Sequence, residues 1–300
     1  MKKIIIVALI ISLLFACAGC KNSENKVSIN KVSKEKKENT LVTEIPYKEN
    51  WLQSDLSAVG IKSAVAEHQK DGYIVGGSNG ELIPCRVYLL SVYDEEKYGK
   101  NSGYHDSFLA IETESKVRFE NVSKKMGSYF DNLYVCDIDG EKGDEIVLQQ
   151  VVGITGGAGQ YLSRIYKVGE KEIKEIFSSV TGEKFDTGFK SEARDGFKVE
   201  ITNMFTKSIT VLDFSKDKEY KGVYFDQSGA VIQKATILCD SFESFVPLDK
   251  DSDGIFEIEC SQYVSLYGHS DYIGDAKTVL KYNSDLQKME IIEASFQPYD

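Results

Sequence analysis

The segment "DKDSDGIFEIEC", residues 249–260, concentrates carboxylates in a pattern that suits a hard cation. Acidic side chains recur at every second position, a glycine follows at Gly254, and a glutamate comes three residues later. Ca²⁺ takes about six to eight oxygen ligands, and a short loop can wrap around it when carboxylates alternate and a glycine permits a sharp turn. Without a cation, carboxylates this close would repel one another. The predicted Ca²⁺ ligands are the side chains of Asp249, Asp251, Asp253 and Glu257 and the main-chain carbonyl of Ile255.

Two other interpretations of this segment differ in what they require. An EF-hand needs a glutamate at the twelfth loop position, which here is Cys260, and a helix on each side. The flanking "SFVPL" and "IEIECSQYV" are typical of strands, so the EF-hand is rejected. A solvated polar turn, in which the aspartates only accept hydrogen bonds from backbone amides, stays open.

A second acidic segment lies 112 positions earlier: "VCDIDGEKGDEIVLQQVV" (135–152) aligns with "PLDKDSDGIFEIECSQYV" (247–264). The carboxylates coincide in this register, but the earlier copy has Lys142 in place of the glycine and a glutamate in place of the third aspartate. Its predicted ligands are Asp137, Asp139, Glu141 and Glu145, with the main chain of Gly143 as the counterpart of Ile255.

The likeness continues beyond the acidic positions. Each copy proceeds through an apolar strand, a loop at 153–159 or 265–275, a strand containing a tyrosine, and a further strand at 173–177 or 288–292. We therefore expect two related units around 130–178 and 242–293, each a meander of four strands. The loops at 153–159 and 265–275 are the predicted partner contacts, because loops are the parts least committed to packing.

The segments "DIDGEKGDEIVL" and "DKDSDGIFEIEC" resemble the calcium loops of the FG-GAP/VCBS repeats that build integrin-like β-propellers. The resemblance implies structural Ca²⁺ and propeller-like antiparallel sheets. It covers two segments of about fifty residues each, and residues 46–300 are too few for a full propeller of this kind. The expected architecture is all-β, as a reduced propeller or as two packed sheet modules.

Residues 41–300 carry an all-β pattern of tyrosines, phenylalanines and β-branched runs between Gly, Asn and Asp turns. One helix is expected near the N-terminus, at 52–69, although Gly60 weakens the pattern. A hairpin turn is expected at 226–230. Outside the two units, strands are expected at 86–94, 107–114, 197–203, 208–214 and 222–226.

The N-terminus is typical of an exported lipoprotein. Two lysines precede an apolar run that is too short to span a bilayer, as in a signal peptide over residues 1–20. The sequence "LLFACAGCKN" resembles a bacterial lipobox, and both Cys17 and Cys20 are candidates for the lipidated cysteine. A lipid anchor would place the protein on the extracytoplasmic face of the cell membrane.

A polar segment, 21–45, is expected to be a disordered tether, because 21–40 holds six lysines, three glutamates and no aromatic residue. Residues 41–300 hold 28 basic and 44 acidic residues, a net charge of −16. An acidic surface of this kind disfavours nucleic acid as a partner and favours the binding of cations.

Few other residues suggest chemistry. Cys136 and Cys260 align with leucines and are expected to be reduced core residues, while the state of Cys85 and Cys239 is left open. No histidine has a partner at zinc-like spacing, and no catalytic motif is present. The sequence therefore favours a non-enzymatic, lipid-anchored, calcium-stabilised module that binds a protein or glycan. The alternative is an extracytoplasmic hydrolase that uses loop residues such as His269 and Asp271.

Overall fold

The computed structural model describes most of the chain beyond residue 42. The described ranges are 43–54, 56–61, 63–76, 79–100, 104–126, 132–155, 158–169, 172–179, 188–217, 220–268 and 271–299. The predicted signal peptide, Cys17, Cys20 and most of the tether lie outside them. Within these ranges, no helix has the length and apolar character needed to cross a membrane.

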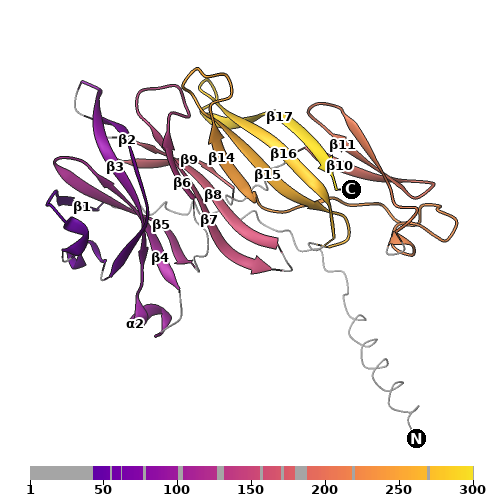
Figure 1. Ribbon diagram of the computed structural model, residues 1–300, viewed down its shortest axis with the longest axis horizontal. Coiled ribbons are helices and arrows are strands. Elements are labelled where there is room, and N and C mark those ends of the chain that lie inside the picture. The colour runs from indigo at the N-terminus through magenta and orange to yellow at the C-terminus, as the bar shows by residue number, and fades with distance from the viewer. Residues whose placement is uncertain are drawn as a thin grey trace, which may run out of the picture. The chain divides into compact units, whose positions relative to one another are not determined.

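The protein is all-β, with four antiparallel sheets (Figure 1). Sheet 1 has the order β1-β5-β4-β3-β2 and contains β1 (Thr43–Pro46), β2 (Ala64–Gly76), β3 (Glu81–Val92), β4 (His105–Glu112) and β5 (Lys116–Met126). Sheet 2 is the meander β6 (Asn132–Cys136), β7 (Glu145–Thr155), β8 (Ala158–Val168) and β9 (Ile173–Ser178). Sheet 3 contains β10 (Phe189–Arg194), β11 (Lys198–Asn203) and β12 (Ile209–Asp213). Sheet 4 contains β13 (Leu238–Cys239), β14 (Ser244–Leu248), β15 (Glu257–Ser265), β16 (Tyr272–Asn283) and β17 (Lys288–Pro298).

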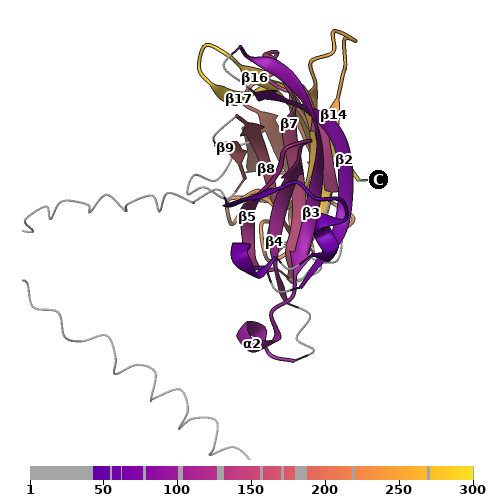
Figure 2. The ribbon, with the colours of Figure 1, turned by 90° about the vertical axis from the view of Figure 1, so that its left-hand side faces the viewer.

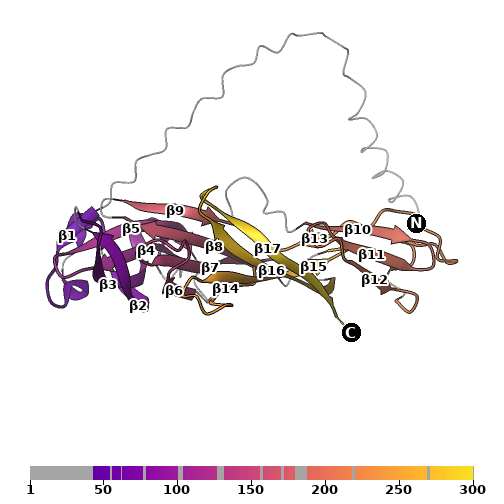
Figure 3. The ribbon, with the colours of Figure 1, turned by 90° about the horizontal axis from the view of Figure 1, so that it is seen from above.

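Hydrophobic clusters lie between successive sheets. Leu109 of sheet 1 belongs to the same buried cluster as Leu148 of sheet 2. Val147, the residue next to Leu148 on β7, shares a second cluster with Ile258 and Leu280 of sheet 4. Successive side chains of a strand point to opposite faces, so sheet 2 is buried on both sides (Figure 3).

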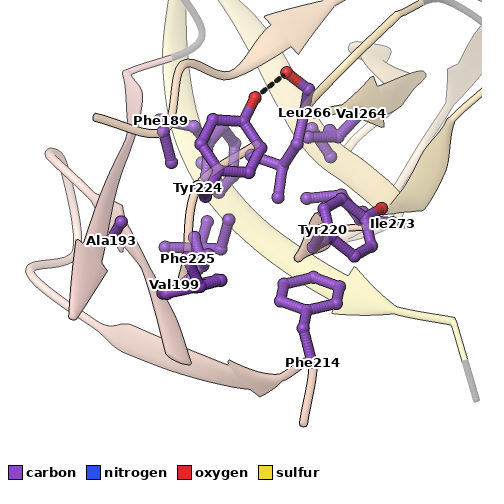
Figure 4. Close-up of a cluster of buried hydrophobic side chains, with 14 residues drawn as sticks. Phe189, Ala193, Val199, Phe214, Tyr220, Tyr224, Phe225, Val264, Leu266 and Ile273 are labelled. Atoms are coloured by element: carbon purple, nitrogen blue, oxygen red, sulfur yellow. Dashed lines mark hydrogen bonds between the residues drawn. The ribbon is translucent and has the colours of Figure 1, made fainter. Parts of the chain in front are cut away.

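A third cluster joins sheet 4 to sheet 3 (Figure 4). Val199 of β11 lies in it together with Leu266, which follows β15, and with aromatic residues from the connection between sheets 3 and 4. Among these, the Tyr224 hydroxyl donates a hydrogen bond to the Leu266 carbonyl oxygen. The connection is therefore part of the core, not a solvated loop.

The strand pairing gives the two acidic segments equivalent positions. Cys136 lies opposite Glu145 in the β6–β7 pair, and Leu248 lies opposite Glu257 in the β14–β15 pair. Both acidic segments therefore connect the same two strands of a four-stranded meander. Of the two architectures expected, the packed sheet modules describe this arrangement, since sheets 2 and 4 share one buried cluster.

The prediction of a helix at 52–69 is wrong. Two short 3-10 turns, η1 (Trp51–Gln53) and η2 (Ser57–Val59), occupy its first part, and Gly60 ends the second turn with φ +73°. The remainder enters β2, whose pairing with β3 supplies hydrogen bonds that outweigh local helix preference. The short helix that does form, α2 (Glu95–Tyr98), is capped by Asp94 and lies beyond the ends of β3 and β4 (Figure 2).

Two further segments differ from the prediction. No named strand forms at 222–226, where Phe225 makes only isolated bridges, although the turn at 226–230 is present, with Asp226 accepting hydrogen bonds from Ser228 and Ala230. Burial of Phe225 in the third cluster explains its apolar pattern without a sheet partner. At the other end, residues 43–45, which were expected to belong to the tether, pair with β5 as part of β1.

The four described cysteines are free thiols. Cys136 and Cys260 lie in the cluster between sheets 2 and 4, as expected for small core residues. Cys85 is also buried, and Cys239 is half-buried.

Candidate metal centre

The first acidic loop connects β6 to β7. Two glycines with positive φ, Gly140 at +71° and Gly143 at +96°, allow it to turn sharply. Asp137 Oδ1 accepts a hydrogen bond from the Gly140 amide at 2.8 Å, and Asp139 Oδ1 accepts one from the Glu141 amide at 2.9 Å. The carboxylates therefore help to hold the turn that carries them.

A lysine from the neighbouring strand lies against this loop. The Lys167 ammonium, on β8, donates to Asp139 Oδ2, and it donates to Glu141 Oε2 at 2.7 Å. The Asp139 side chain is only 1% exposed. Burial alone would lower the pKa of Lys167, but the hydrogen bonds to the two carboxylates raise it above its ordinary value, so this lysine stays charged. The first loop thus has a cation of its own.

Glu145, at the start of β7, has no ion pair with a lysine among the described residues. Its Oε2 accepts hydrogen bonds from the Ile138 amide at 2.9 Å and the Asp139 amide at 3.3 Å. Burial nevertheless raises the pKa of Glu145 to about 8, and it raises the pKa of Asp137 as well. Ligand atoms of Asp137, Asp139 and Glu145 all lie within 4.8 Å of one another.

The second acidic loop connects β14 to β15. Ligand atoms of Asp249, Asp251 and Asp253 lie within 4.8 Å of one another, on a more exposed surface than the first group. The two oxygens of Asp249 accept from the amides of Asp253, at 3.1 Å, and Gly254, at 3.2 Å. Asp253 Oδ1 accepts from the Ile255 amide at 2.8 Å. These bonds are the ones that a polar turn would make.

Asp251 distinguishes the two interpretations of this loop. Its side chain accepts no hydrogen bond from the described part of the chain, whereas the side chains of Asp249 and Asp253 do. In a turn held by aspartates, Asp249 and Asp253 have hydrogen-bond roles, whereas Asp251 is exposed to solvent and has none. A bound cation accounts for all three.

A lysine also lies near the second loop, but it binds a different carboxylate. Lys281 on β16 donates to Glu257 Oε1 at 2.6 Å, and Glu257 is 3% exposed. Burial would raise the pKa of Glu257, but the Lys281 ammonium and a hydrogen bond from the Lys250 amide hold that pKa below its ordinary value. Among the described residues, the three aspartates form no direct ion pair, although the charges of Asp251 and Asp253 help to raise the pKa of Lys281.

The structure therefore brings together six of the ten predicted ligands, in two groups of three. Glu141 and Glu257 lie instead against lysines. Lys167 lies opposite Glu145 in the β7–β8 pair, and Lys281 bonds to Glu257, but these lysines are 114 residues apart and so do not coincide at the offset of 112. A search for lysines in the second strand after each acidic loop, without a fixed offset, would have found both.

The two remaining predicted positions, Ile255 and Gly143, each pack against a different neighbour. A Cβ atom on Gly140 would lie 2.9 Å from Cδ1 of Ile255, so the isoleucine packs directly on the first loop. Beside it, the Phe256 amide donates to the Asp137 carbonyl oxygen at 2.7 Å. Gly143 packs against Val75 of β2. A change in the shape of one acidic loop therefore reaches the other.

The residues considered for a hydrolase are not assembled into a site by the described residues. His269 lies outside the described ranges, as do parts of both loops expected to contact a partner. Asp271 accepts hydrogen bonds from the Tyr220 hydroxyl and from the Tyr267 amide, at 3.0 Å, and so holds its own loop in place.

These observations define an all-β protein of packed antiparallel sheets with two acidic loops in contact. Residues 187–297 match the family model of the YybI C-terminal domain, a range that includes the second acidic loop and begins after the first. The chain is similar to a Bacillus subtilis (strain 168) protein described as "Uncharacterized protein YybI", with 22% identity over 172 residues, 57% of this chain and 63% of that protein. The alignment thus spans less than two thirds of this relative. No solved structure matches the chain.

Proposed function

We propose that the protein is a lipid-anchored, extracytoplasmic β-sheet module that binds a partner without catalysing a reaction, and that Ca²⁺ at the second acidic loop stabilises it. The observation that carries the calcium proposal is the convergence of Asp249, Asp251 and Asp253 within 4.8 Å while the nearby lysine is paired with Glu257. Alternating carboxylates on a loop with left-handed residues, Ser252 and Gly254, provide oxygen ligands of the kind that Ca²⁺ prefers.

The role of the ion would be structural. The second loop joins β14 to β15, and its last residues pack on the first loop and in the cluster between sheets 2 and 4. An ion that binds only the folded loop adds its binding free energy to the free energy of unfolding. At a Ca²⁺ concentration about 100 times the dissociation constant, this contribution is about 2.7 kcal/mol.

The membrane anchor rests on the lipobox-like segment at Cys17 and Cys20 and on the polar segment that follows it. The binding role rests on the absence of a recognised catalytic motif in the sequence and on the acidic surface of the sheet domain. Metabolic labelling of the full-length chain with a fatty acid tests the anchor directly. Loss of label in the Cys17→Ser or the Cys20→Ser variant identifies the modified cysteine, and an unlabelled wild-type chain would contradict the anchor.

Thermal unfolding with Ca²⁺ or with EGTA tests the calcium proposal. Ca²⁺ is expected to raise the Tm of the wild-type chain by roughly 5–10 °C. Asp251→Asn is the diagnostic variant, because Asp251 supports no hydrogen bond of the turn and its loss should leave the metal-free Tm almost unchanged. A calcium-dependent shift that is the same in the variant, or absent in the wild type, would contradict the proposal.

A further inference from the structure

A cleft of about 720 Å³ lies on sheet 1 and next to the first acidic loop. Its walls come from β2, β3, the turn after β4, and Asp144 of that loop. Gly72 lets β2 approach β6 beside the cleft, because a Cβ at this position would lie 2.3 Å from Cγ1 of Val135. The volume is in the range of small-molecule sites, roughly 300–1,000 Å³.

Glu112 is held in one orientation in this cleft. Its Oε2 accepts hydrogen bonds from the Trp51 indole and, at 2.9 Å, from the Tyr88 hydroxyl. Trp51 is 3% exposed, and its ring packs edge-on against Tyr88 and Phe119, so these donors are fixed by the core of sheet 1. A carboxylate with one oxygen fixed by rigid aromatic donors is preorganised to bind with the other.

The charge of the cleft is negative. Four carboxylates and one guanidinium line it, a net charge of −3. The guanidinium, Arg86, is already paired with Asp71, Nε to Oδ1 at 2.8 Å, and its NH1 lies 4.0 Å from Glu112 Oε1. This one guanidinium lies between Asp71 and Glu112 and balances only one of the four carboxylates, so the remaining charge of −3 favours a cation.

The spacing of these carboxylates favours an extended organic cation over a metal ion. Among the described residues, three or more potential ligand atoms within 4.8 Å of one another occur only in the two acidic loops, and not in this cleft. Two half-exposed tyrosines also line it, Tyr47 at 41% and Tyr73 at 52% exposure. Aromatic faces attract ammonium groups and cover the aliphatic segments between them.

We propose that this cleft binds an extended aliphatic polyammonium ligand, either a free polyamine or a lysine-rich peptide segment. The proposal rests on the binding function proposed above and deepens it by naming the site and the class of ligand. Asp144 connects the cleft to the first acidic loop, because its amide donates to the Tyr73 carbonyl oxygen and its Oδ2 accepts from the Tyr73 amide, both at 2.7 Å. The loop thus positions one wall of the site.

Calorimetric titration of the chain with spermidine, in EGTA and low salt, tests the proposal. Saturable binding of one spermidine per chain is expected, with affinity that falls as salt is raised. Fully acetylated spermidine, which has the same chain length without charge, is expected not to bind. A trilysine peptide forms the second arm: tighter binding than spermidine assigns the site to a peptide, and weaker binding assigns it to a free polyamine.

Glu112→Gln is the diagnostic variant, since the amide oxygen can still accept from Trp51 and Tyr88 while the charge is lost. Spermidine affinity should fall by about ten-fold or more. Glu192→Gln removes an exposed carboxylate, also paired with an arginine, from sheet 3 and serves as the matched control with unchanged affinity. Should the Glu112 variant unfold, Glu114→Gln, on an exposed residue of the cleft, is expected to weaken binding by about two- to five-fold.

The proposal is overturned if neither spermidine nor trilysine binds at millimolar concentration, if acetylated spermidine binds equally well, or if the cleft variants and the control behave alike. The calcium proposal is judged separately by the Tm in Ca²⁺ and EGTA. A chain that responds to Ca²⁺ but binds no polyamine refutes only the cleft, and the reverse result refutes only the calcium site.

Discussion

The two acidic loops have the same place in two related sheets but differ in which carboxylate their lysine neutralises. In the first loop, Lys167 pairs with Asp139 of the loop and not with the buried Glu145, although its charge opposes the rise in the pKa of Glu145. In the second, Lys281 pairs with Glu257 of the strand and leaves the aspartates of the loop to converge. The position of one ammonium group therefore separates two loops that look alike in sequence.

This difference bears on metal binding because an ammonium and Ca²⁺ compete for the same oxygens. A lysine tethered to the neighbouring strand occupies its carboxylates at a high effective concentration. Ca²⁺ at the first loop must displace Lys167 from Asp139, whereas at the second loop Asp249, Asp251 and Asp253 have no such competitor. The comparison predicts that the second loop binds Ca²⁺ more tightly than the first.

The largest expected effect comes from the core shared by the sheets that carry the loops. Phe245 of β14 is fully buried, and its ring stacks on Phe177 of β9 with 5.5 Å between centroids. Phe245→Ala should lower the free energy of unfolding by about 3–5 kcal/mol, measured by urea unfolding. Val246→Ala, at a position that is 36% exposed, is the control and should lower it by less than about 1 kcal/mol. Two separate unfolding transitions, one for each sheet, would contradict a shared core.

The contact between the loops should have the next largest effect. Gly140 and Gly60 have almost the same φ, +71° and +73°, but only Gly140 has a neighbour, Ile255, in the way of a Cβ. Alanine at either position should reduce stability by about 1 kcal/mol because of the left-handed backbone. Gly140→Ala should lose about 1 kcal/mol more, since Ile255 must shift.

Gly140→Ala should also weaken Ca²⁺ binding at the second loop, because the main-chain carbonyl of Ile255, two residues after Asp253, is itself a predicted ligand. Chemical denaturation and calcium titration of both variants measure these effects. Equal losses for Gly140→Ala and Gly60→Ala, with the same Ca²⁺ affinity, would show that the loops are not coupled through this contact.

The lysines should give the smallest change in stability but the sharpest change in metal binding. Lys167→Met and Lys281→Met should each cost about 1 kcal/mol in EGTA, less than for a fully buried pair because the lysine side chains are 30% and 37% exposed. Lys167→Met should add a second Ca²⁺ site, since it frees Asp139 and Glu141. Lys281→Met should retain a single site. The same number of bound Ca²⁺ ions in both variants and in the wild type would show that the lysines do not cause the difference between the two loops.

The sequence was sufficient to predict the features that local patterns specify. Alternating carboxylates and the apolar strand after them predicted two acidic segments 112 residues apart, and each segment connects two paired strands in the structure. Turn chemistry at 226–230 was also local, because Asp226 accepts hydrogen bonds from residues of the same turn. The all-β class followed from composition and periodicity.

Features that depend on distant partners were missed. The segment 64–69 forms a strand because β3 pairs with it, and Phe225 is apolar because another sheet covers it. The lysines of the acidic loops were missed because Lys281 follows Glu257 by 24 residues whereas Lys167 follows Glu145 by 22, which breaks the simple offset. The cleft near Glu112 could not be foreseen, since its residues come from five separate parts of the chain.

Calcium stoichiometry in matched variants of the two loops tests the central claim most directly. Asp137→Asn and Asp251→Asn each remove one charge from one group of three carboxylates. Calorimetric titration should find one tight Ca²⁺ site in the wild-type chain, retained in Asp137→Asn and weakened by about ten-fold or more, or about 1.4 kcal/mol, in Asp251→Asn. Loss of the site in Asp137→Asn with retention in Asp251→Asn, or no tight site in the wild type, would contradict the account.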